Sequence, residues 1–426
     1  MRVAIIGSGI AGLGCARLLQ DQGCQVVVFE ANDYAGGHTH TVDVTLNGIT
    51  TPVDTGFLVY NDRTYPRLIA LFDELGIESA PSTMSFAVRD DEDAVEWAGT
   101  DLAALFAQTT NLVRPAFWRM LADILRFNRD TTAMQRADRV YCITLSEYLD
   151  EGRYSAPFRD WYLLPMAAAI WSVPLSDVLD FPLPTFVHFC DRHGLLQIRD
   201  RPQWRTVAGG ARTYVQRIVA QLDDVRLSTP VRRVRRGANH VEIETSPTTA
   251  ERFDQVVFAC HSDQTLGLLA DPTRQESELL GSVRYQSNRV LLHTDSRLMP
   301  RRRRAWSAWN YLAARERTDL PVCVTYWINK LQPLPFDTPV LVTLNPPFEP
   351  SAHSLIDEFE YAHPVVKGAA VAAQQRFAPL QGQRRTWYAG AWLGHGFHED
   401  GLESAHRVAD GIAAQSAAVE AELAAV

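Results

Sequence analysis

Apolar and polar residues near the start of the chain follow two different periods. Residues 3–6 ("VAII") and 25–29 ("QVVVF") are almost continuous apolar runs, the pattern of parallel strands that are covered on both faces. Between these runs, residues 10–22 carry apolar side chains at helical spacing. The pattern predicts a strand, a helix and a second strand parallel to the first.

Three glycines join the first predicted strand to the helix. Gly7, Gly9 and Gly12 form the spacing GxGxxG, in which the glycines allow a tight turn, a close approach to a pyrophosphate, and close packing of helix on strand. The N-terminal amides of the helix then face the anion. Glu30 ends the second strand, where a carboxylate binds ribose hydroxyls. These residues predict a dinucleotide site, but they do not distinguish NAD from FAD.

Composition narrows the class of protein. The chain of 426 residues is 46% hydrophobic and 21% charged, as in globular proteins, and its formal charge of −9 gives no support for a nucleic-acid partner. No apolar run reaches the roughly 18 to 20 residues of a membrane span, and the apolar start is interpreted as a buried strand and not a signal peptide. The cysteines lack CxxC spacing and predict reduced thiols in a cytoplasmic protein; they are Cys15, Cys24, Cys142, Cys190, Cys260 and Cys323.

A second pair of glycines, Gly36 and Gly37, begins six residues after Glu30. This pattern resembles the flavin amine oxidase and phytoene desaturase superfamily, in which an acid is followed by Gly-Gly and usually by arginine. The resemblance implies FAD as the cofactor. Here His38 stands where arginine is usual, and a histidine carries full charge only below its pKa.

Longer motifs point to one branch of that superfamily. "GGHTHTV" and "VDTGFLVYN" resemble FAD-binding proteins associated with cyclopropane fatty acid synthases and the N-terminal flavin domain of plant cyclopropane synthases. Nearly the whole chain shares the resemblance, through motifs such as "TYPRLIALFDELGI", "AAAIWSVP", "VTYWINKLQ" and "GFHEDGL".

The resemblance implies an α/β fold of the amine-oxidase type. A discontinuous, Rossmann-like FAD-binding domain is expected from residues 1–75, 201–265 and 381–426. An α+β substrate-binding domain is expected from residues 76–200, which are rich in helical spacing with a break at Pro115, and from 266–380, which contain strand-like runs such as "RVLLHTD" and "PVLVTLN".

The resemblance also assigns positions to the cofactor. A glycine-rich segment near residues 390–396 leads into a helix that starts near Glu399 and directs its positive N-terminus at the flavin. Amine oxidases usually carry an acid after "AG", where this chain has Ala391 and Trp392. The FAD-binding positions implied are Gly7, Gly9, Ile10, Ala11, Gly12, Glu30, Ala31, Gly36, Gly37, His38, Gly56, Phe57, Leu58, Val231 (through its backbone), Gly390, Ala391, Gly401 and Leu402.

The sequence does not fix a catalytic residue. The family's reaction is hydride removal by FAD, so no catalytic triad is expected; His398 and Tyr60 are the candidates for proton handling near the flavin. His395, His398 and Glu399 match no zinc spacing, and no metal is predicted. Asp54 is interpreted as a structural turn acid. The candidates for contact with substrate are Asn61, Trp171, Tyr326 and Phe397, with ordinary core packing as the alternative for the aromatic residues.

A basic run is the one obvious charge patch. Arg301, Arg302, Arg303 and Arg304 suit either a solvated loop or contact with an anionic membrane, the latter because Leu298, Met299, Trp306 and Trp309 flank them. The protein is therefore expected in the cytoplasm, with peripheral contact at the inner face of the membrane as the sharper alternative.

Three functions remain open at this point. The leading one is an FAD-dependent oxidoreductase that removes hydride from a methylene- or cyclopropane-containing fatty acyl chain, as a lipid desaturase. The first alternative is a flavin-dependent amine oxidase, which Phe397 disfavours because tyrosine is common at that position. The second alternative is a non-catalytic flavoprotein partner of a lipid methyltransferase.

Overall fold

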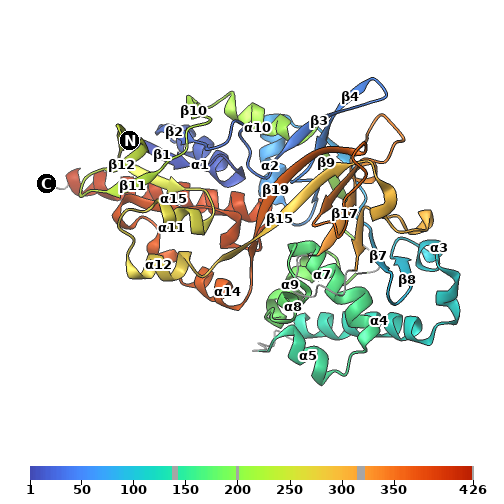
Figure 1. Cartoon of the computed structure of the whole chain (residues 1–426). Coiled ribbons are helices and arrows are strands. Elements are labelled where there is room, and N and C mark those ends of the chain that lie inside the picture. The colour runs from blue at the N-terminus through green and yellow to red at the C-terminus, as the bar shows by residue number, and fades with distance from the viewer. Residues whose placement is uncertain (137–142, 198–200, 314–321, 425–426) are drawn as a thin grey trace.

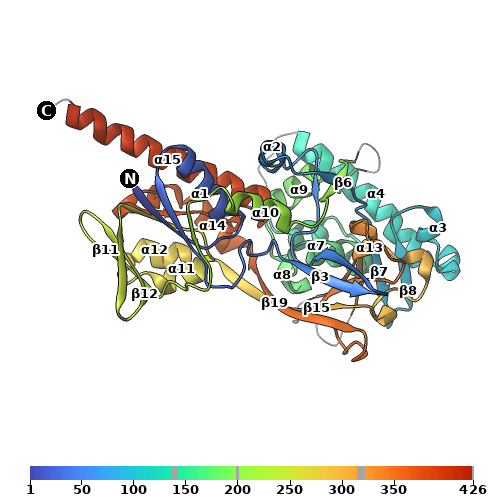
Figure 2. The ribbon, with the colours of Figure 1, turned by 90° about the horizontal axis from the view of Figure 1, so that it is seen from above.

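The computed structural model describes residues 1–136, 143–197, 201–313 and 322–424. Figure 1 shows two parts side by side. One contains both ends of the described chain, and the other contains helices α3 to α9 together with strands β7, β8 and β17. Figure 2 shows the same separation from above.

A five-stranded parallel sheet forms the centre of the first part. Its strand order is β10-β2-β1-β14-β20, and every neighbouring pair is parallel. Alternate residues of β1 point to opposite faces, so Val3 and Ile5 pack with the helices α1 and α15, while Ala4 and Ile6 pack with the opposite layer. The strands are β1 (Arg2–Ile6), β2 (Gln25–Phe29), β10 (Asp224–Arg226), β14 (Gln255–Phe258) and β20 (Thr386–Tyr388).

The two faces of this sheet are covered differently. Helices α1 (Ile10–Asp21) and α15 (His398–Ala424) cover one face. The other face packs against an antiparallel sheet and against α12 and α14. This layer comprises β11 (Arg233–Arg236), β12 (Val241–Ser246), β13 (Thr249–Phe253), α11 (Ser262–Leu268), α12 (Arg274–Leu280) and α14 (Gly368–Gln375).

The second part is built on a seven-stranded sheet of order β19-β15-β18-β17-β16-β7-β8. Only β16 and β7 pair in parallel; the other pairs are antiparallel. The strands are β7 (Phe86–Asp90), β8 (Val95–Ala98), β15 (Arg284–His293), β16 (Trp309–Leu312), β17 (Cys323–Trp327), β18 (Leu341–Leu344) and β19 (Leu355–Val365). The long strands β15 and β19 connect the two parts, because β15 follows α12 and β19 precedes α14.

Helices pack beside this sheet and share its large apolar core. Pro115 occupies the first position of α4, where its missing N–H costs nothing. The helices are α3 (Leu102–Leu105), α4 (Pro115–Arg136), α5 (Leu145–Glu151), α6 (Ala156–Phe158), α7 (Leu164–Trp171), α8 (Leu175–Leu179), α9 (Leu183–Arg192) and α13 (Ile328–Leu331), with a π-helical turn at Arg159–Leu163.

Short elements lie between the two parts. They are the hairpin β3 (Thr41–Leu46) and β4 (Ile49–Asp54), a small sheet of β5 (Tyr60–Asn61), β9 (Trp204–Val207) and β6 (Ser79–Pro81), and the helices α2 (Pro66–Leu75) and α10 (Arg212–Val219).

The predicted α/β fold of the amine-oxidase type is confirmed, including the parallel strands and the helix of the first thirty residues. The exact domain boundaries stay a prediction. Within the described chain, no helix is both long and apolar enough to cross a bilayer. The cysteines that the structure describes are free thiols, and Cys142 lies outside the described residues.

Candidate cofactor site and its family

Three glycines form the turn after β1, and only one of them, Gly9, has open space where a side chain would lie. A side-chain Cβ at Gly12 would lie 1.9 Å from the carbonyl oxygen of Gly7, and one at Gly7 would lie 2.9 Å from that of Ala259. A Cβ at Gly9 would meet no atom within 4 Å. Gly9 precedes α1, whose first turn has no acidic residue and no side-chain cap. The free amides of α1 therefore face open space, as an anion site requires.

Glu30 lies beside this turn and holds it in place through hydrogen bonds. Its carboxylate accepts hydrogen bonds from the backbone N–H of Ser8 at 2.9 Å, from the Ser8 hydroxyl at 2.6 Å and from the N–H of Asn32 at 2.9 Å. Its backbone also pairs with the segment before β11, since the N–H of Thr229 donates to the carbonyl of Glu30. That pairing brings Val231 to the same end of the sheet.

The second glycine pair lies directly against the first turn. Gly9 and Gly36 form a parallel bridge, and Gly36 donates from its N–H to the Ser8 carbonyl at 3.0 Å. Gly36 and Gly37 have φ of 121° and 57°, which favour glycine. A Cβ at Gly37 would lie 3.2 Å from the Cα of Gly9, so the two loops pass each other with little space between them.

His38 is neutral and partly unsatisfied. Burial lowers its pKa well below the ordinary value, and the neighbouring His363 and His261 lower it further. The His38 ring centroid lies 5.2 Å from that of His363 and 5.4 Å from that of Tyr361. Its Nε2 atom is buried and has no hydrogen-bond partner among the described residues, so a polar group of a ligand would satisfy it.

The loop of Gly56, Phe57 and Leu58 joins His38 to the start of α15. Phe57 donates from its N–H to the His38 carbonyl at 2.8 Å, and a Cβ at Gly56 would lie 2.1 Å from that carbonyl oxygen. The Phe57 ring stacks on His398 with centroids 3.7 Å apart. The loop therefore runs from the second glycine pair to the first residue of α15.

Helices α1 and α15 cross closely at their N-terminal ends. A Cβ at Gly401 would lie 2.8 Å from the Cγ2 of Ile10, and Leu402 packs in one cluster with Ile10 and Phe57. At the entrance to α15, Gly390 donates from its N–H to the Ser404 hydroxyl at 2.9 Å, and Ala391 follows. Two helix N-termini thus converge on one region, and both favour negative charge there.

His398 takes part in a neutral hydrogen-bond chain. Its Nε2 lies 3.0 Å from the Thr39 hydroxyl, which lies 2.5 Å from the Tyr214 hydroxyl. Burial lowers the pKa of His398 to about 3. His398 is therefore uncharged at neutral pH and holds Thr39, and its role in proton handling stays a prediction.

The acids of the first α15 turn accept hydrogen bonds from the backbone. Glu399 accepts from the backbone N–H groups of Arg67 and Leu68 at 2.8 and 3.1 Å, and so caps α2. Asp400 accepts from the N–H of Phe397 at 2.9 Å. Burial raises the pKa of both carboxyl groups.

Asp54 is a buried structural acid that joins three segments. Its carboxylate accepts from Thr41 at 2.5 Å, from the N–H of Ala211 at 2.9 Å and from Gln332 at 2.6 Å. Burial raises its pKa to about 6, against the effect of these donors. The contacts agree with its interpretation as a turn acid.

Two of the four predicted substrate residues, Trp171 and Phe397, meet in one aromatic cluster. Phe189 lies between Trp171 and Phe397, with ring centroids at 4.5 and 5.2 Å, and it stacks on His193 at 4.2 Å. The ring of Tyr326 instead packs edge-on against Trp309, with centroids 4.9 Å apart, and its hydroxyl forms a hydrogen bond with Ser172, the residue after Trp171. Burial lowers the pKa of His193 to about 4, so it too is neutral at neutral pH.

The other two chemical candidates are engaged in local structure. The Asn61 side chain accepts from the N–H groups of Arg63 and Thr64, both at 2.9 Å, and so holds a turn. Tyr60 is 3% exposed and packs against Tyr65 and Phe72 in the core. Their roles toward substrate and proton stay predictions.

The apolar residues beside the arginine run differ from the expectation. Leu298 and Met299 are each 1% exposed, and Leu298 packs with Leu312 and Cys323. Buried side chains cannot contact a membrane, so the expectation that Leu298 and Met299 contribute to membrane contact is wrong. The four arginines themselves are exposed; Arg301 pairs with Asp91 and Arg302 with Glu96.

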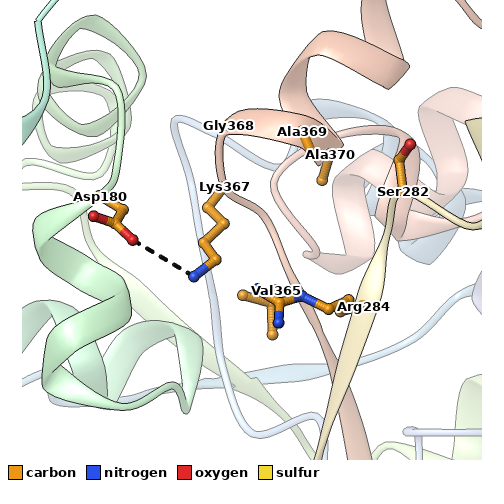
Figure 3. Close-up of a pocket in the computed structure, with 8 residues that line it drawn as sticks. All are labelled: Asp180, Ser282, Arg284, Val365, Lys367, Gly368, Ala369 and Ala370. Carbon is orange, nitrogen blue, oxygen red and sulfur yellow. Dashed lines mark ion pairs between the residues drawn. The ribbon is translucent and has the colours of Figure 1, made fainter.

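A cavity of about 210 Å³ lies where the two parts of the molecule join, lined by Asp180, Ser282, Arg284, Val365 and 367–370. Figure 3 shows Lys367 pointing toward Asp180. The Lys367 amine lies 2.7 Å from Asp177 and 3.7 Å from Asp180. Two carboxylates neutralise this lysine. The cavity is therefore interpreted as a structural contact, in which an ion-pair network connects the two parts of the molecule.

Residues 10–328 match the model of the flavin-containing amine oxidoreductase family, which is most of the chain. The chain belongs to this family. Its members carry a flavin, and FAD is the cofactor of this oxidoreductase. The narrower resemblance to the branch associated with cyclopropane synthases stays a prediction.

Relatives in sequence are amine oxidases by name. AofH of Mycobacterium tuberculosis, named a flavin-containing monoamine oxidase, is 28% identical over 262 residues, covering 58% of this chain and 54% of AofH. The chain thus spans about half the length of that relative. Human amine oxidase B is 42% identical over 77 residues, which cover 18% of this chain and 14% of that protein.

Solved structures confirm the fold of this family member. Cyclohexylamine oxidase from Brevibacterium oxydans has a TM-score of 0.67 at 18% identity, covering 97% of this chain and 99% of that one. A fatty acid isomerase from P. acnes that produces CLA also has a TM-score of 0.67, at 15% identity, covering 96% and 97%. At these identities the likeness concerns the fold alone.

The residues of this flavin oxidoreductase fit FAD. The open space before Gly9, the unsatisfied Nε2 of His38 and the convergent helix ends are features that a bound dinucleotide would use. Glu30 would hold the ribose, α1 the pyrophosphate and the start of α15 the flavin. The implied contacts stay predictions residue by residue.

Several residues at this site carry no signal in the sequence. Ser8 and Thr39 form hydrogen bonds that link segments far apart, and Phe189, Tyr214 and His363 lie on elements whose patterns indicate only a core. Ser8 and Thr39 do lie within the motifs GxGxxG and GGHTHTV, but neither motif indicates which partners their hydroxyls contact.

We expect the purified protein to be yellow, with one FAD that is not covalently bound. The C-terminal flavin segment has no thiol to form a thioether, because no cysteine follows Cys323. Acid or heat denaturation should therefore release the flavin into the supernatant, where its absorbance is measured. Flavin that stays with the precipitated protein would contradict this expectation.

Proposed function

We propose that this FAD-dependent oxidoreductase removes hydride from a modified fatty acyl chain, one that carries a methylene branch or a cyclopropane ring. The observation that supports the proposal is the aromatic cluster of Trp171, Phe189 and Phe397, with ring centroids 4.5 and 5.2 Å apart, at the N-terminal end of α15. Trp171 and Phe189 are buried. An acyl chain that packed against this cluster would be stabilised, because its burial removes apolar area from water.

The electrostatics of this region also favour an uncharged substrate. His193, which stacks on Phe189, is neutral at neutral pH because burial lowers its pKa to about 4. A cationic amine gains little from neutral groups and loses its hydration when it is buried. An acyl chain has no such loss.

Bound FAD supplies the hydride acceptor for the reaction. The protein's own contribution is to hold the chain against the aromatic cluster and to exclude water from the carbon that reacts. The C–H bond next to a methylene branch or a strained ring is the weak point of such a chain. Loss of a hydride there and of a proton from a neighbouring carbon gives a conjugated alkene.

A flavin-dependent amine oxidase is the second candidate. It is supported by the relatives in sequence, because AofH and amine oxidase B are amine oxidases by name. The fold is compatible with both lipid oxidation and amine oxidation, since the proteins of similar structure include a cyclohexylamine oxidase and a fatty acid isomerase.

The two candidates are separated by anaerobic flavin bleaching. We expect the oxidised-flavin absorbance of the purified holoprotein to fall rapidly with methylene- or cyclopropane-containing acyl lipids, and not with simple amines. Product analysis by mass spectrometry should then show a loss of two hydrogens. Rapid bleaching by amines with none by lipids would replace the proposal by the second candidate.

A conservative variant tests the aromatic cluster. Phe397→Tyr adds a hydroxyl that an acyl chain leaves without a partner, at a cost of about 1 to 3 kcal/mol. We expect kcat/KM for the lipid to fall about tenfold or more while the FAD content stays the same. Phe348→Tyr, at an exposed phenylalanine that is distant in the chain, is the matched control. An unchanged kcat/KM in Phe397→Tyr would remove Phe397 from the substrate surface.

A further inference from the structure

The exposed apolar side chains of this protein are concentrated in one segment. Among the described residues, the five most exposed large apolar side chains all lie between 102 and 125: Leu102 at 74%, Leu112 at 49%, Val113 at 83%, Trp118 at 51% and Leu125 at 57%. Single exposed apolar residues are normal, but a cluster marks an interaction site. These five residues are called the apical patch below.

Trp118 links the segments that carry the apical patch. The Trp118 indole donates to the Leu112 carbonyl at 2.9 Å, and its ring lies 5.6 Å from that of Phe106 at the end of α3. Leu125 follows Trp118 by seven residues on α4 and so lies on the same helix face, about 10 Å further along. In Figures 1 and 2, α3 and α4 lie at the end of the molecule opposite the two termini.

Basic residues surround the apical patch, although the protein as a whole has a charge of −9. Residues 101–130 contain four arginines and three acids. Asp123 is buried and paired with Arg126, Asp130 is paired with Arg129, and Asp101 caps α3, so Arg114 and Arg119 are the arginines of this segment for which no ion pair is seen among the described residues. Arg119 is exposed beside Trp118. The arginine run 301–304 adds four more, of which Arg301 and Arg302 are paired with Asp91 and Glu96. Its helical turn at Arg303–Ala305 packs against α3.

Charge and apolar character together indicate one kind of partner. A second copy of this chain would bring its own basic residues against these, which is unfavourable. An anionic lipid surface attracts the arginines and receives the apolar side chains at the boundary between headgroups and acyl chains. Tryptophan is itself enriched at that boundary.

We propose that the apical patch is a docking surface for an anionic lipid bilayer. Leu102, Val113 and Leu125 insert at the headgroup boundary, and Arg119 and Arg304 contact lipid phosphates. In this proposal the arginine run contacts the membrane together with the apical patch. The apical patch supplies the apolar side chains, because Leu298 and Met299, which flank the run, are buried. The proposal concerns where the protein binds and does not depend on which substrate it oxidises.

Vesicle sedimentation with the full chain and its FAD tests the proposal. We expect binding to vesicles that contain phosphatidylglycerol, weaker binding to pure phosphatidylcholine, and loss of binding at high salt. The double variant Val113→Ser with Leu125→Ser should bind about tenfold more weakly. The matched control is Ile49→Ser with Leu227→Ser, two exposed apolar residues elsewhere, and it should bind as the wild type does.

Charge reversal provides a second measurement. Arg119→Glu with Arg304→Glu should weaken binding to the anionic vesicles about 25-fold or more, since each arginine near such a surface contributes roughly fivefold and each glutamate is repelled by it. Arg233→Glu, on an exposed position of β11, should leave it unchanged. Retained flavin colour and an unchanged melting temperature show that each variant is folded.

Three results would overturn the proposal: no vesicle binding by the wild type, unchanged binding by the apical-patch variants, or a wild-type dimer that these variants convert to a monomer in light scattering without any vesicle binding. The last would assign the patch to a second copy of the chain. Because no turnover is needed, failure here leaves the proposed lipid oxidation standing. Oxidation of amines by a vesicle-bound protein would overturn only that proposed function.

Discussion

Glu30→Ala is expected to give a folded protein that loses FAD on dilution. The carboxylate would hold the ribose through two charge-assisted hydrogen bonds, each contributing about 1.5 to 3 kcal/mol. Their loss corresponds to a Kd for FAD that is higher by about a hundredfold or more. Gel filtration followed by flavin absorbance measures the retained cofactor, and circular dichroism shows whether the chain is folded.

Ser8→Ala separates the two roles of Glu30. In the structure the carboxylate also fixes the glycine turn, through the N–H of Ser8 and its hydroxyl. Ser8→Ala removes the hydroxyl contact and leaves the carboxylate free for the ribose, so we expect FAD to be retained. Equal loss of FAD in both variants would mean that Glu30 acts by holding the turn. Full retention in Glu30→Ala would exclude it from cofactor binding.

The free energy of unfolding should fall in mild acid, with a measurable share from His293. This side chain is 0% exposed, accepts from the N–H of Asp295 at 3.0 Å and lies 2.7 Å from the Thr343 hydroxyl. Burial lowers its pKa from 6.5 to about 4. The unfolded chain therefore binds the proton first as the pH falls, and stability that is complete above pH 6.5 is lost toward pH 4. Between pH 7 and 5 the loss is about 2 kcal/mol.

His293→Gln isolates this contribution. Urea unfolding with excess FAD at pH 7 and pH 5 gives the stability difference between wild type and variant at each pH. We expect that difference to shrink by about 2 kcal/mol at the lower pH, because glutamine does not titrate. Other groups, including Asp54 with its raised pKa, cancel in the comparison. A difference independent of pH would show that His293 keeps an ordinary pKa in the folded state.

Local signals allowed the cofactor half of the fold to be predicted. The strand, glycine turn, helix and acid of the first thirty residues interact mainly with one another, so spacing alone determines their arrangement. The start of the last helix was likewise placed correctly, because glycines mark the turn before His398.

The substrate side depends on contacts that a single sequence does not display. Phe189 and Phe397 stack although they are far apart in the chain, and the pattern of each segment indicates only apolar character. Leu298 and Leu102 also show that the sequence does not indicate whether a given leucine is buried or exposed. Both are isolated leucines in mixed segments, yet Leu298 is buried against Leu312 and Leu102 is 74% exposed.

The crossing of α1 and α15 also has a consequence for the order of folding. The ribosome delivers α1 early, whereas β20 and α15, which complete the sheet and cover α1, are synthesised long afterwards. Until then the apolar face of α1 has no permanent cover, and an emerging chain in that state is prone to aggregation. Capture of the cofactor must wait for the same late segment, so the nascent chain is expected to need chaperone protection through most of its synthesis.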